Sequence, residues 1–383
     1  MLFTNGRLIF SDRSEDDLSL RVEDGKIAEI GGDISRRGEE TIDLQGNYLA
    51  PGFIDLHVHG AAGRDTMEGT LDAFRAICAY HASGGTTSLC LTTITAPLEE
   101  ITRVVRAIAA AMAEIPQIRG AHVEGPFISP EKSGAQASQF IVEPREEFVR
   151  QLLAESAAIR RVTLAPERPD ALDLIARLTT LGIAASGGHS AAWDEEARAA
   201  FECGMRQITH TFNCMSSMRR RDGVRTAGLL EFALSEPEIF CELIADGHHV
   251  STTLMRMLYR AKGAGGICLV TDATAGAGLP NESRFSLGDK ECVVRDGACW
   301  LADGSALAGS AARMIDLVRQ MVAQVGVPLH EAVRMATETP ARAMEWKNKG
   351  TLAEGMDADF AVLSPELEVV RTFAVSQASS PDR

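Results

Sequence analysis

The sequence predicts an α/β protein, a (β/α)8 barrel of the TIM type beside a small β-sandwich built from both chain ends. Eight short apolar runs separated by helix-like segments begin near residue 50, and this alternation is typical of a closed parallel barrel. Strand-like runs with turn signals lie before and after that region. The alternative for the middle of the chain is a doubly wound open sheet.

We expect three consecutive sections. Residues 1–49 form the N-terminal part of the β-sandwich, residues 50–345 form the barrel, and residues 346–383 return to the sandwich and end in a frayed tail. Asn5-Gly6 and Asp24-Gly25 lie between apolar runs, and both pairs favour the positive φ of hairpin turns. A further hairpin is expected around residues 296–297.

The expected barrel strands are rich in Val, Ile, Leu and Thr, as buried parallel strands are. They cover residues 52–58, 86–92, 118–124, 162–166, 183–188, 206–211, 240–245 and 267–272. Helical patterns cover residues 97–114, 145–159, 169–181, 191–203, 251–262, 310–325 and 329–345. The last strands of the sandwich are expected at 358–363 and 366–375.

Composition excludes several function classes. The chain has 38 Lys and Arg against 53 Asp and Glu, a net charge of −15, which argues against a nucleic-acid partner. No apolar run is long enough for a membrane span, and we expect no membrane partner. The first residues lack a signal-peptide pattern, and the eight cysteines contain no CxxC motif. Both observations favour a cytoplasmic protein with reduced thiols.

Histidine placement is the most informative feature of the sequence. Seven of the nine histidines lie in or just after the C-terminal ends of predicted strands. In a barrel these ends meet at the mouth that carries the active site. One histidine alone is more often structural than a ligand, but this gathering indicates a site. The seven are His57, His59, His122, His189, His210, His248 and His249.

Several of these side chains suit a divalent metal. His57 and His59 share one face of the first strand, because side chains at i and i+2 point the same way. Glu124 ends the third strand and can bridge two cations, although pairing with a basic residue is the alternative. His189 and His210 offer nitrogen ligands suited to Zn²⁺ or Fe²⁺. His122 fits a structural role as well as a ligand role.

Asp272 ends the eighth predicted strand. A carboxylate at a metal centre can take a proton from water and pass it on, so Asp272 is the candidate catalytic acid and base. The alternative is a helix N-cap, which Gly276 and Gly278 disfavour.

Longer motifs resemble a known family. Residues 51–60 (PGFIDLHVHG) resemble the first-strand motif of the amidohydrolase superfamily. Residues 122–127 (HVEGPF), 244–250 (IADGHHV) and 269–275 (LVTDATA) resemble the N-acetylglucosamine-6-phosphate deacetylases within it. Further similar segments lie at 134–136, 209–213, 307–310, 334–343 and 350–352, so the resemblance extends to about residue 375.

The resemblance implies a homodimer that hydrolyses the acetamide of an amino sugar 6-phosphate with the help of a divalent metal. It implies Glu124, His189 and His210 as metal ligands and Asp272 as the catalytic acid and base. Phosphate contacts in this family partly cross the dimer interface. The implied substrate-binding residues are Ala135, Gln136, Asn213, Cys214, Arg221, His249, Leu307, Ala308 and Gly309.

The metal count follows from the first-strand pair. Glu124, His189 and His210 complete one site, which leaves His57 and His59 for a second. We therefore predict one or two divalent ions per chain, with the second site the weaker. We expect the metal to be Zn²⁺, with Fe²⁺ as the alternative. The alternative is that the histidine pair binds only water.

Three positions depart from the family pattern. Gln136 stands where a histidine is frequent, Cys214 where an alanine is common, and Ser216-Ser217 where a proline often occurs. Because all of them are expected near the sugar, N-acetylgalactosamine 6-phosphate is an alternative substrate. Arg221 belongs to a run of three arginines. The alternative to a role in phosphate binding is that this run forms a solvated basic loop.

Two competing functions share part of this pattern. A different metal-dependent amidohydrolase, such as a dihydroorotase or an N-acyl amino-acid hydrolase, would have the same metal ligands but not the pair of Arg221 and His249. A non-catalytic metal-binding protein would not need Asp272 at the end of the eighth strand.

Overall fold

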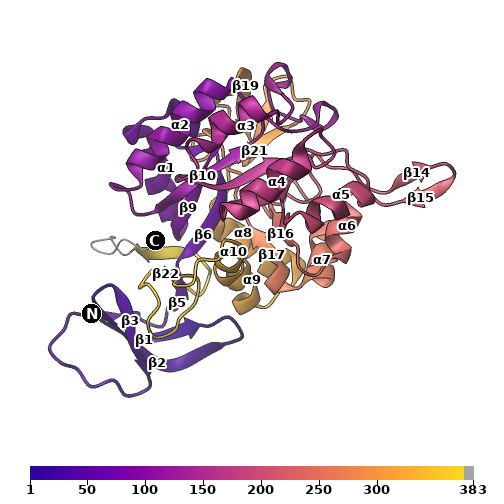
Figure 1. Cartoon of the computed structure of the whole chain (residues 1–383). Helices are drawn as coiled ribbons and strands as arrows, with labels where there is room; N and C mark the ends of the chain where they lie inside the picture. The colour runs from indigo at the N-terminus through magenta and orange to yellow at the C-terminus, as the bar shows by residue number, and fades with distance from the viewer. Residues whose placement is uncertain (375–383) are drawn as a thin grey trace.

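The computed structural model describes residues 1–374 and consists of a barrel beside a separate sheet (Figure 1). Eight parallel strands follow one another in chain order around the barrel, and a parallel bridge between Val58 and Ala273 connects its two ends. The predicted α/β barrel is confirmed. Its strands are β6 (Phe53–Val58), β9 (Thr86–Thr93), β10 (Ile118–Glu124), β11 (Ile159–Leu164), β12 (Ala184–Gly187), β13 (Gln207–Ile208), β16 (Phe240–Leu243) and β17 (Ile267–Leu269).

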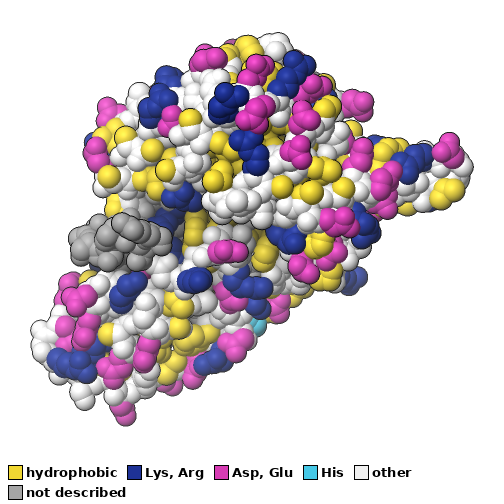
Figure 2. All heavy atoms as spheres, in the orientation of Figure 1, with side chains coloured by type: hydrophobic (Ala, Val, Ile, Leu, Met, Phe, Trp, Pro, Cys, Tyr) yellow, Lys and Arg dark blue, Asp and Glu magenta, His cyan; other side chains and the backbone are white. Residues whose placement is uncertain are grey.

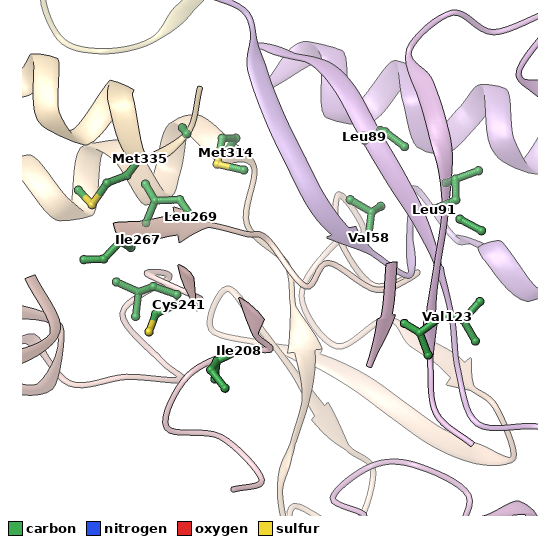
Figure 3. Close-up of a cluster of buried hydrophobic side chains, with 14 of the residues drawn as sticks. Val58, Leu89, Leu91, Val123, Ile208, Cys241, Ile267, Leu269, Met314 and Met335 are labelled. Atoms are coloured by element: carbon green, nitrogen blue, oxygen red, sulfur yellow. The ribbon is translucent and has the colours of Figure 1, made fainter. Parts of the chain in front are cut away.

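Helices cover the outside of the barrel because each has one apolar face. In α2, Ile101, Val104, Val105 and Ile108 recur every three or four residues and are fully buried. Figure 3 shows apolar side chains of the strands, such as Val123, in the cluster that these helices complete. The helices are α1 (Leu71–Ser83), α2 (Leu98–Ala111), α3 (Glu146–Leu153), α4 (Ala171–Thr180), α5 (Asp194–Glu202), α6 (Leu229–Ser235), α7 (Thr252–Lys262), α8 (Met314–Gln320), α9 (Leu329–Met335) and α10 (Glu338–Ala343).

A seven-stranded sheet unites the two ends of the chain. Its strands are β1 (Leu2–Ile9), β2 (Ser14–Glu23), β3 (Lys26–Gly31), β4 (Thr41–Asp43), β5 (Tyr48–Pro51), β22 (Phe360–Leu363) and β23 (Val369–Phe373). β5 pairs with β22. The sheet has an apolar core of its own, which includes Phe3, Leu20 and Phe360. The section boundaries at 49 and 345 stay a prediction, and the predicted frayed tail from residue 376 lies outside the described residues.

The hairpin expected at Asn5-Gly6 is wrong. β1 runs straight through both residues, with Asn5 at a φ of 55° and shifts of register on either side of Gly6. A Cβ on Gly6 would lie 2.5 Å from the Leu44 side chain, so close packing requires this glycine. The dipeptide therefore marks a bulge, which favours the same residues as a turn. The hairpins at residues 24–25 and 296–297 are present.

One helix prediction was too long. α3 ends at Leu153, although the pattern extended to residue 159, and β11 already begins at Ile159. Ile159 is buried and pairs with Ala121 of β10, so sheet pairing ends the helical segment early. Tertiary contacts here override the local helical pattern.

Three small sheets, four 3-10 turns and one π-helical turn complete the described part of the chain. The hairpin of β14 (Arg219–Arg221) and β15 (Val224–Thr226) projects from the molecule, at the right of Figures 1 and 2. The rest comprises β7 (Gly60–Ala61), β8 (Arg64–Asp65), the four-stranded sheet of β18 (Arg284–Leu287), β19 (Lys290–Arg295), β20 (Ala298–Leu301) and β21 (Leu307–Ser310), 3-10 turns at Thr66–Glu68, Pro130–Lys132, Ser138–Phe140 and Ala264–Gly266, and a π-helical turn at Met321–Val325.

The surface, the cysteines and the helices of the described residues have the following properties. On the face shown in Figure 2, acidic and basic side chains are interspersed. All eight cysteines lie within the described residues and are free thiols. None of the helices in residues 1–374 combines the length and the apolar composition that crossing a bilayer would need.

Candidate metal centre and active site

Glu124 is the centre of a cluster at the carboxyl ends of the barrel strands. Its Oε1 lies 3.2 Å from Nε2 of His210 and 3.3 Å from Nε2 of His189. Its Oε2 lies 3.1 Å from Nε2 of His59, and His57 Nε2 is 3.6 Å from Oε1. The barrel thus places one buried carboxylate between two pairs of imidazoles. Two groups of side chains that could hold a metal ion result, and both include Glu124.

The donor chemistry of this cluster fits a divalent cation. His189 Nδ1 donates to the carbonyl of Lys132 at 2.7 Å, so its Nε2 is the nitrogen that faces His210 Nε2 at 3.1 Å. Oε1 of Glu124 is buried, and no donor in residues 1–374 makes a well-aligned hydrogen bond to it. Buried acceptors left without donors are rare unless something else satisfies them. Imidazole nitrogens and a carboxylate suit Zn²⁺ or Fe²⁺.

Electrostatics point the same way. Burial alone would raise the pKa of Glu124, but the nearby imidazoles of His57, His189 and His210 hold it well below its usual range. Burial alone would lower the pKa of His189, but its interactions with the nearby Cys214 and Glu124 side chains raise it well above the ordinary value. The cluster therefore attracts protons to the same place where a dication would compete with them.

Asp272 faces the second pair of histidines. Its Oδ1 lies 3.4 Å from Nε2 of both His57 and His59. Its backbone N–H donates to the carbonyl of His57 at 3.0 Å, which fixes the end of β17 against β6. The φ values of His189, His210 and Asp272 are 46°, 29° and 48°, in the left-handed region. Such backbone strain is concentrated at functional sites.

A cavity opens directly over this cluster. Most of the predicted substrate-binding residues line it: Ala135, Gln136, Asn213, Cys214, His249, Leu307 and Gly309. Asp272 and four of the candidate ligands (His59, Glu124, His189 and His210) also line it. Lining residues that were not predicted include Ile94, Ile244, Thr274, Leu287 and Ala306.

Two polar side chains in the cavity wall are held by neighbours. Gln136 accepts a hydrogen bond from the N–H of Thr95 at 2.8 Å and donates to Glu124 Oε2 at 2.7 Å. His249 contacts Asp246 Oδ2 through Nδ1 at 2.7 Å. Burial lowers the pKa of His249, but Asp246 outweighs burial and raises it above the ordinary value. His249 is thereby prepared to become a cation that faces the cavity.

The structure does not bring two of the predicted substrate-binding residues into the cavity of the same chain. Ala308 is fully buried in the apolar cluster beneath β18–β21, because alternate residues of β21 point to opposite faces. Arg221 lies on the projecting hairpin, where it contacts Glu195 at 2.6 Å and covers the ring of Trp193.

Sequence reasoning missed two charged residues below the cluster. Arg161 of β11 and Glu242 of β16 are buried inside the barrel and form an ion pair. A charged residue within an apolar barrel strand was the available signal. Both ring nitrogens of His122 form hydrogen bonds, with the hydroxyls of Thr92 at 3.2 Å and Thr163 at 2.7 Å. This arrangement favours a supporting role for His122 over a ligand role.

Comparison with known proteins identifies the family. The Amidohydrolase family model matches residues 48–378. The chain belongs to the amidohydrolase family. This member is 33% identical to the N-acetylglucosamine-6-phosphate deacetylase of Lysinibacillus sphaericus over 97% of this chain and 96% of that protein. It is 34% identical to the N-acetylgalactosamine-6-phosphate deacetylase of Escherichia coli O157:H7, over 98% of each chain.

Solved structures agree with this assignment to the amidohydrolase family. The crystal structure of N-acetylglucosamine-6-phosphate deacetylase from Pasteurella multocida superimposes with a TM-score of 0.92 at 31% identity, covering 97% of each chain. An aspartate-to-alanine variant of the Mycobacterium smegmatis enzyme, in complex with N-acetyl-D-glucosamine-6-phosphate, gives a TM-score of 0.91 at 30% identity, over 98% of this chain and 97% of that one. The resemblance found in the sequence is confirmed.

Proposed function

We propose that this amidohydrolase hydrolyses the acetamide of N-acetyl-D-glucosamine 6-phosphate to D-glucosamine 6-phosphate and acetate, in amino sugar catabolism in the cytoplasm. The observation that carries the proposal is a single cavity lined by Asp272, Glu124 and His249. Glu124 belongs to both candidate metal groups, and the raised pKa of His249 favours its cationic form. An amide is a poor electrophile with a poor leaving group, so the site must supply both activation and a proton. The free thiols fit the compartment.

Two groups of ligands would hold the metal. Glu124, His189 and His210 form one group, and His57 and His59 join Glu124 in the other. A bound divalent cation would make a water molecule on it more acidic and would polarise the amide carbonyl. We propose Zn²⁺ as its identity, because nitrogen ligands predominate.

Asp272 performs the proton transfers in this proposal. The carboxylate takes a proton from the attacking water and then delivers it to the amine nitrogen as the C–N bond breaks. The Gln136 amide has one N–H left after its bond to Glu124, and this N–H is a neutral donor for the acyl oxygen. A neutral donor stabilises a developing oxyanion less than a charged imidazole does.

We assign the phosphate to His249 and Arg221. His249 lines the cavity, and Asp246 supports its charge. Arg221 projects away from its own cavity on the β14–β15 hairpin, so we propose that it serves the cavity of a second chain in a homodimer. Sedimentation tests the homodimer, and a fully active monomer at assay concentration would contradict it. Guanidinium groups bind phosphate oxygens in a bidentate manner.

A second candidate substrate is N-acetylgalactosamine 6-phosphate, since a relative of comparable similarity is named for that activity. The deciding experiment measures acetate release from N-acetylglucosamine and N-acetylgalactosamine, each with and without the 6-phosphate, after Zn²⁺ reconstitution. We expect turnover of the phosphorylated glucosamine derivative at the highest kcat/KM. Preference for the galactosamine derivative would assign the second substrate. A metal-loaded protein that releases acetate from none of these four compounds would reject both substrates.

A further inference from the structure

Glu242 is a buried carboxylate that the proposed reaction does not use. It lies on β16, its side chain is 2% exposed, and its Oε2 lies 3.2 Å from Nδ1 of the fully buried His57. The opposite nitrogen of His57, Nε2, faces the candidate metal ligands, 3.1 Å from His59 Nε2. His57 thus has one nitrogen on a carboxylate and the other in the cluster.

Three fixed partners hold Glu242 in place. Its Oε2 also accepts the backbone N–H of His210 at 2.9 Å, and its Oε1 pairs with the guanidinium of Arg161. Arg161 is itself anchored by the hydroxyls of Ser186 and Thr209, at 2.7 Å and 3.3 Å. All of these groups are buried, so the carboxylate has no alternative position in water.

This arrangement determines which nitrogen of His57 carries the proton. If the proton were on Nε2, the lone pair of Nδ1 would face the carboxylate oxygen, and two acceptors would repel each other. The proton would also occupy the side of the ring that faces His59. With the proton on Nδ1, the ring donates to Glu242 and presents a free lone pair at Nε2.

We propose that Glu242, held by Arg161, is a positioning residue that fixes the tautomer of His57 and thereby makes His57, His59 and Glu124 a second metal site. A carboxylate behind a ligating histidine orients the ring and increases its basicity, and removing such a partner weakens metal binding by about 10- to 100-fold. The inference rests on the proposed metal-dependent function, but it concerns metal binding and not turnover.

The test compares four proteins: the native chain, Glu242→Gln, the double variant Glu242→Gln/Arg161→Met, and Glu39→Gln. The double variant removes the unpaired buried guanidinium that could prevent Glu242→Gln from folding. Glu39→Gln is the matched control, because Glu39 pairs with another buried arginine, Arg21, in the terminal sheet. Bound zinc is measured by mass spectrometry across a series of buffered free Zn²⁺ concentrations.

We expect two binding steps in the native chain and in Glu39→Gln. In Glu242→Gln and in the double variant, the weaker step shifts to about 10- to 100-fold higher free Zn²⁺. The tighter step, assigned to Glu124, His189 and His210, stays in place. Equal shifts of both steps, or no shift of the weaker one, would overturn the proposal.

A second measurement reports the tautomer directly. In metal-free protein labelled with ¹⁵N-histidine, the His57 signals, assigned with His57→Ala, should show a proton on Nδ1. A proton on Nε2 with none on Nδ1 in the native chain would overturn the proposal whatever the variants do. A protein that shows both binding steps and the Nδ1 proton but releases no acetate would reject the proposed function and leave the positioning role intact.

Discussion

Two fully buried arginines, one in the terminal sheet and one in the barrel, are neutralised in different ways. Arg21 of β2 contacts Glu29 and Glu39, whose side chains are 41% and 15% exposed, at the rim of the sheet. Arg161 contacts Glu242, whose side chain is 2% exposed. Water can replace a lost partner at the rim, but it cannot do so inside the barrel.

The difference shows how each region uses buried charge. In the sheet, carboxylates close over an arginine and fix a local fold. In the barrel, the arginine holds a carboxylate that contacts His57, and in our proposal this charge supports the candidate metal site. We therefore expect substitutions in the barrel to reduce turnover, stability or both, and substitutions in the sheet to reduce stability alone.

The largest expected effect is that of Asp272→Asn. The amide keeps the shape of the side chain but cannot accept or deliver the proton, so kcat should fall by about 10²- to 10⁴-fold. The midpoint of denaturant unfolding should stay close to that of the native chain. Turnover within about tenfold of the native value would remove Asp272 from its proposed role.

Arg161→Met should produce the largest loss of stability. It leaves the Glu242 carboxylate buried without its cation, which costs about 3–5 kcal/mol in the free energy of unfolding. Urea unfolding followed by circular dichroism measures this cost. Adding Glu242→Gln to the same chain should recover most of it, and a double variant as unstable as the single one would show that packing, not charge, is at issue.

Arg21→Met should cost less, about 1.5–3 kcal/mol, because the carboxylates it leaves can be hydrated. Acetate release per folded molecule should not change, since the terminal sheet contributes no residue to the cavity lining. A stability loss equal to that of Arg161→Met would break the contrast between the two regions.

The smallest expected effect concerns His249. The raised pKa keeps its imidazole cationic at slightly acidic pH, and the positive charge is lost as the pH rises through that pKa. KM for a phosphorylated substrate should therefore increase with pH above neutrality. His249→Gln should raise this KM about tenfold at pH 6.5 and abolish the pH dependence. Equal changes of kcat/KM on phosphorylated and unphosphorylated substrates would show that His249 does not contact the phosphate.

The sequence predicts the barrel and the candidate ligands for a definite reason. Continuous apolar runs identify parallel strands, and parallel strands of a barrel end at one mouth, so His189 and Glu124 are expected to meet there. The pairing of Arg161 with Glu242 depends instead on side chains from separate strands that meet only after the barrel closes. The projection of Arg221 on its hairpin also follows from tertiary contacts, here with Glu195.

The left-handed backbone of His189, His210 and Asp272 has an evolutionary consequence. Each such residue costs the fold about 1–3 kcal/mol, in a protein class whose net stability is about 5–15 kcal/mol. Glycine at these positions would relieve the strain and raise the stability of the fold. We expect such a chain to be inactive, because it lacks the proposed ligands and the proposed acid and base. Selection for stability alone would therefore replace these three residues early. Only selection for turnover retains the strained backbone at the barrel mouth.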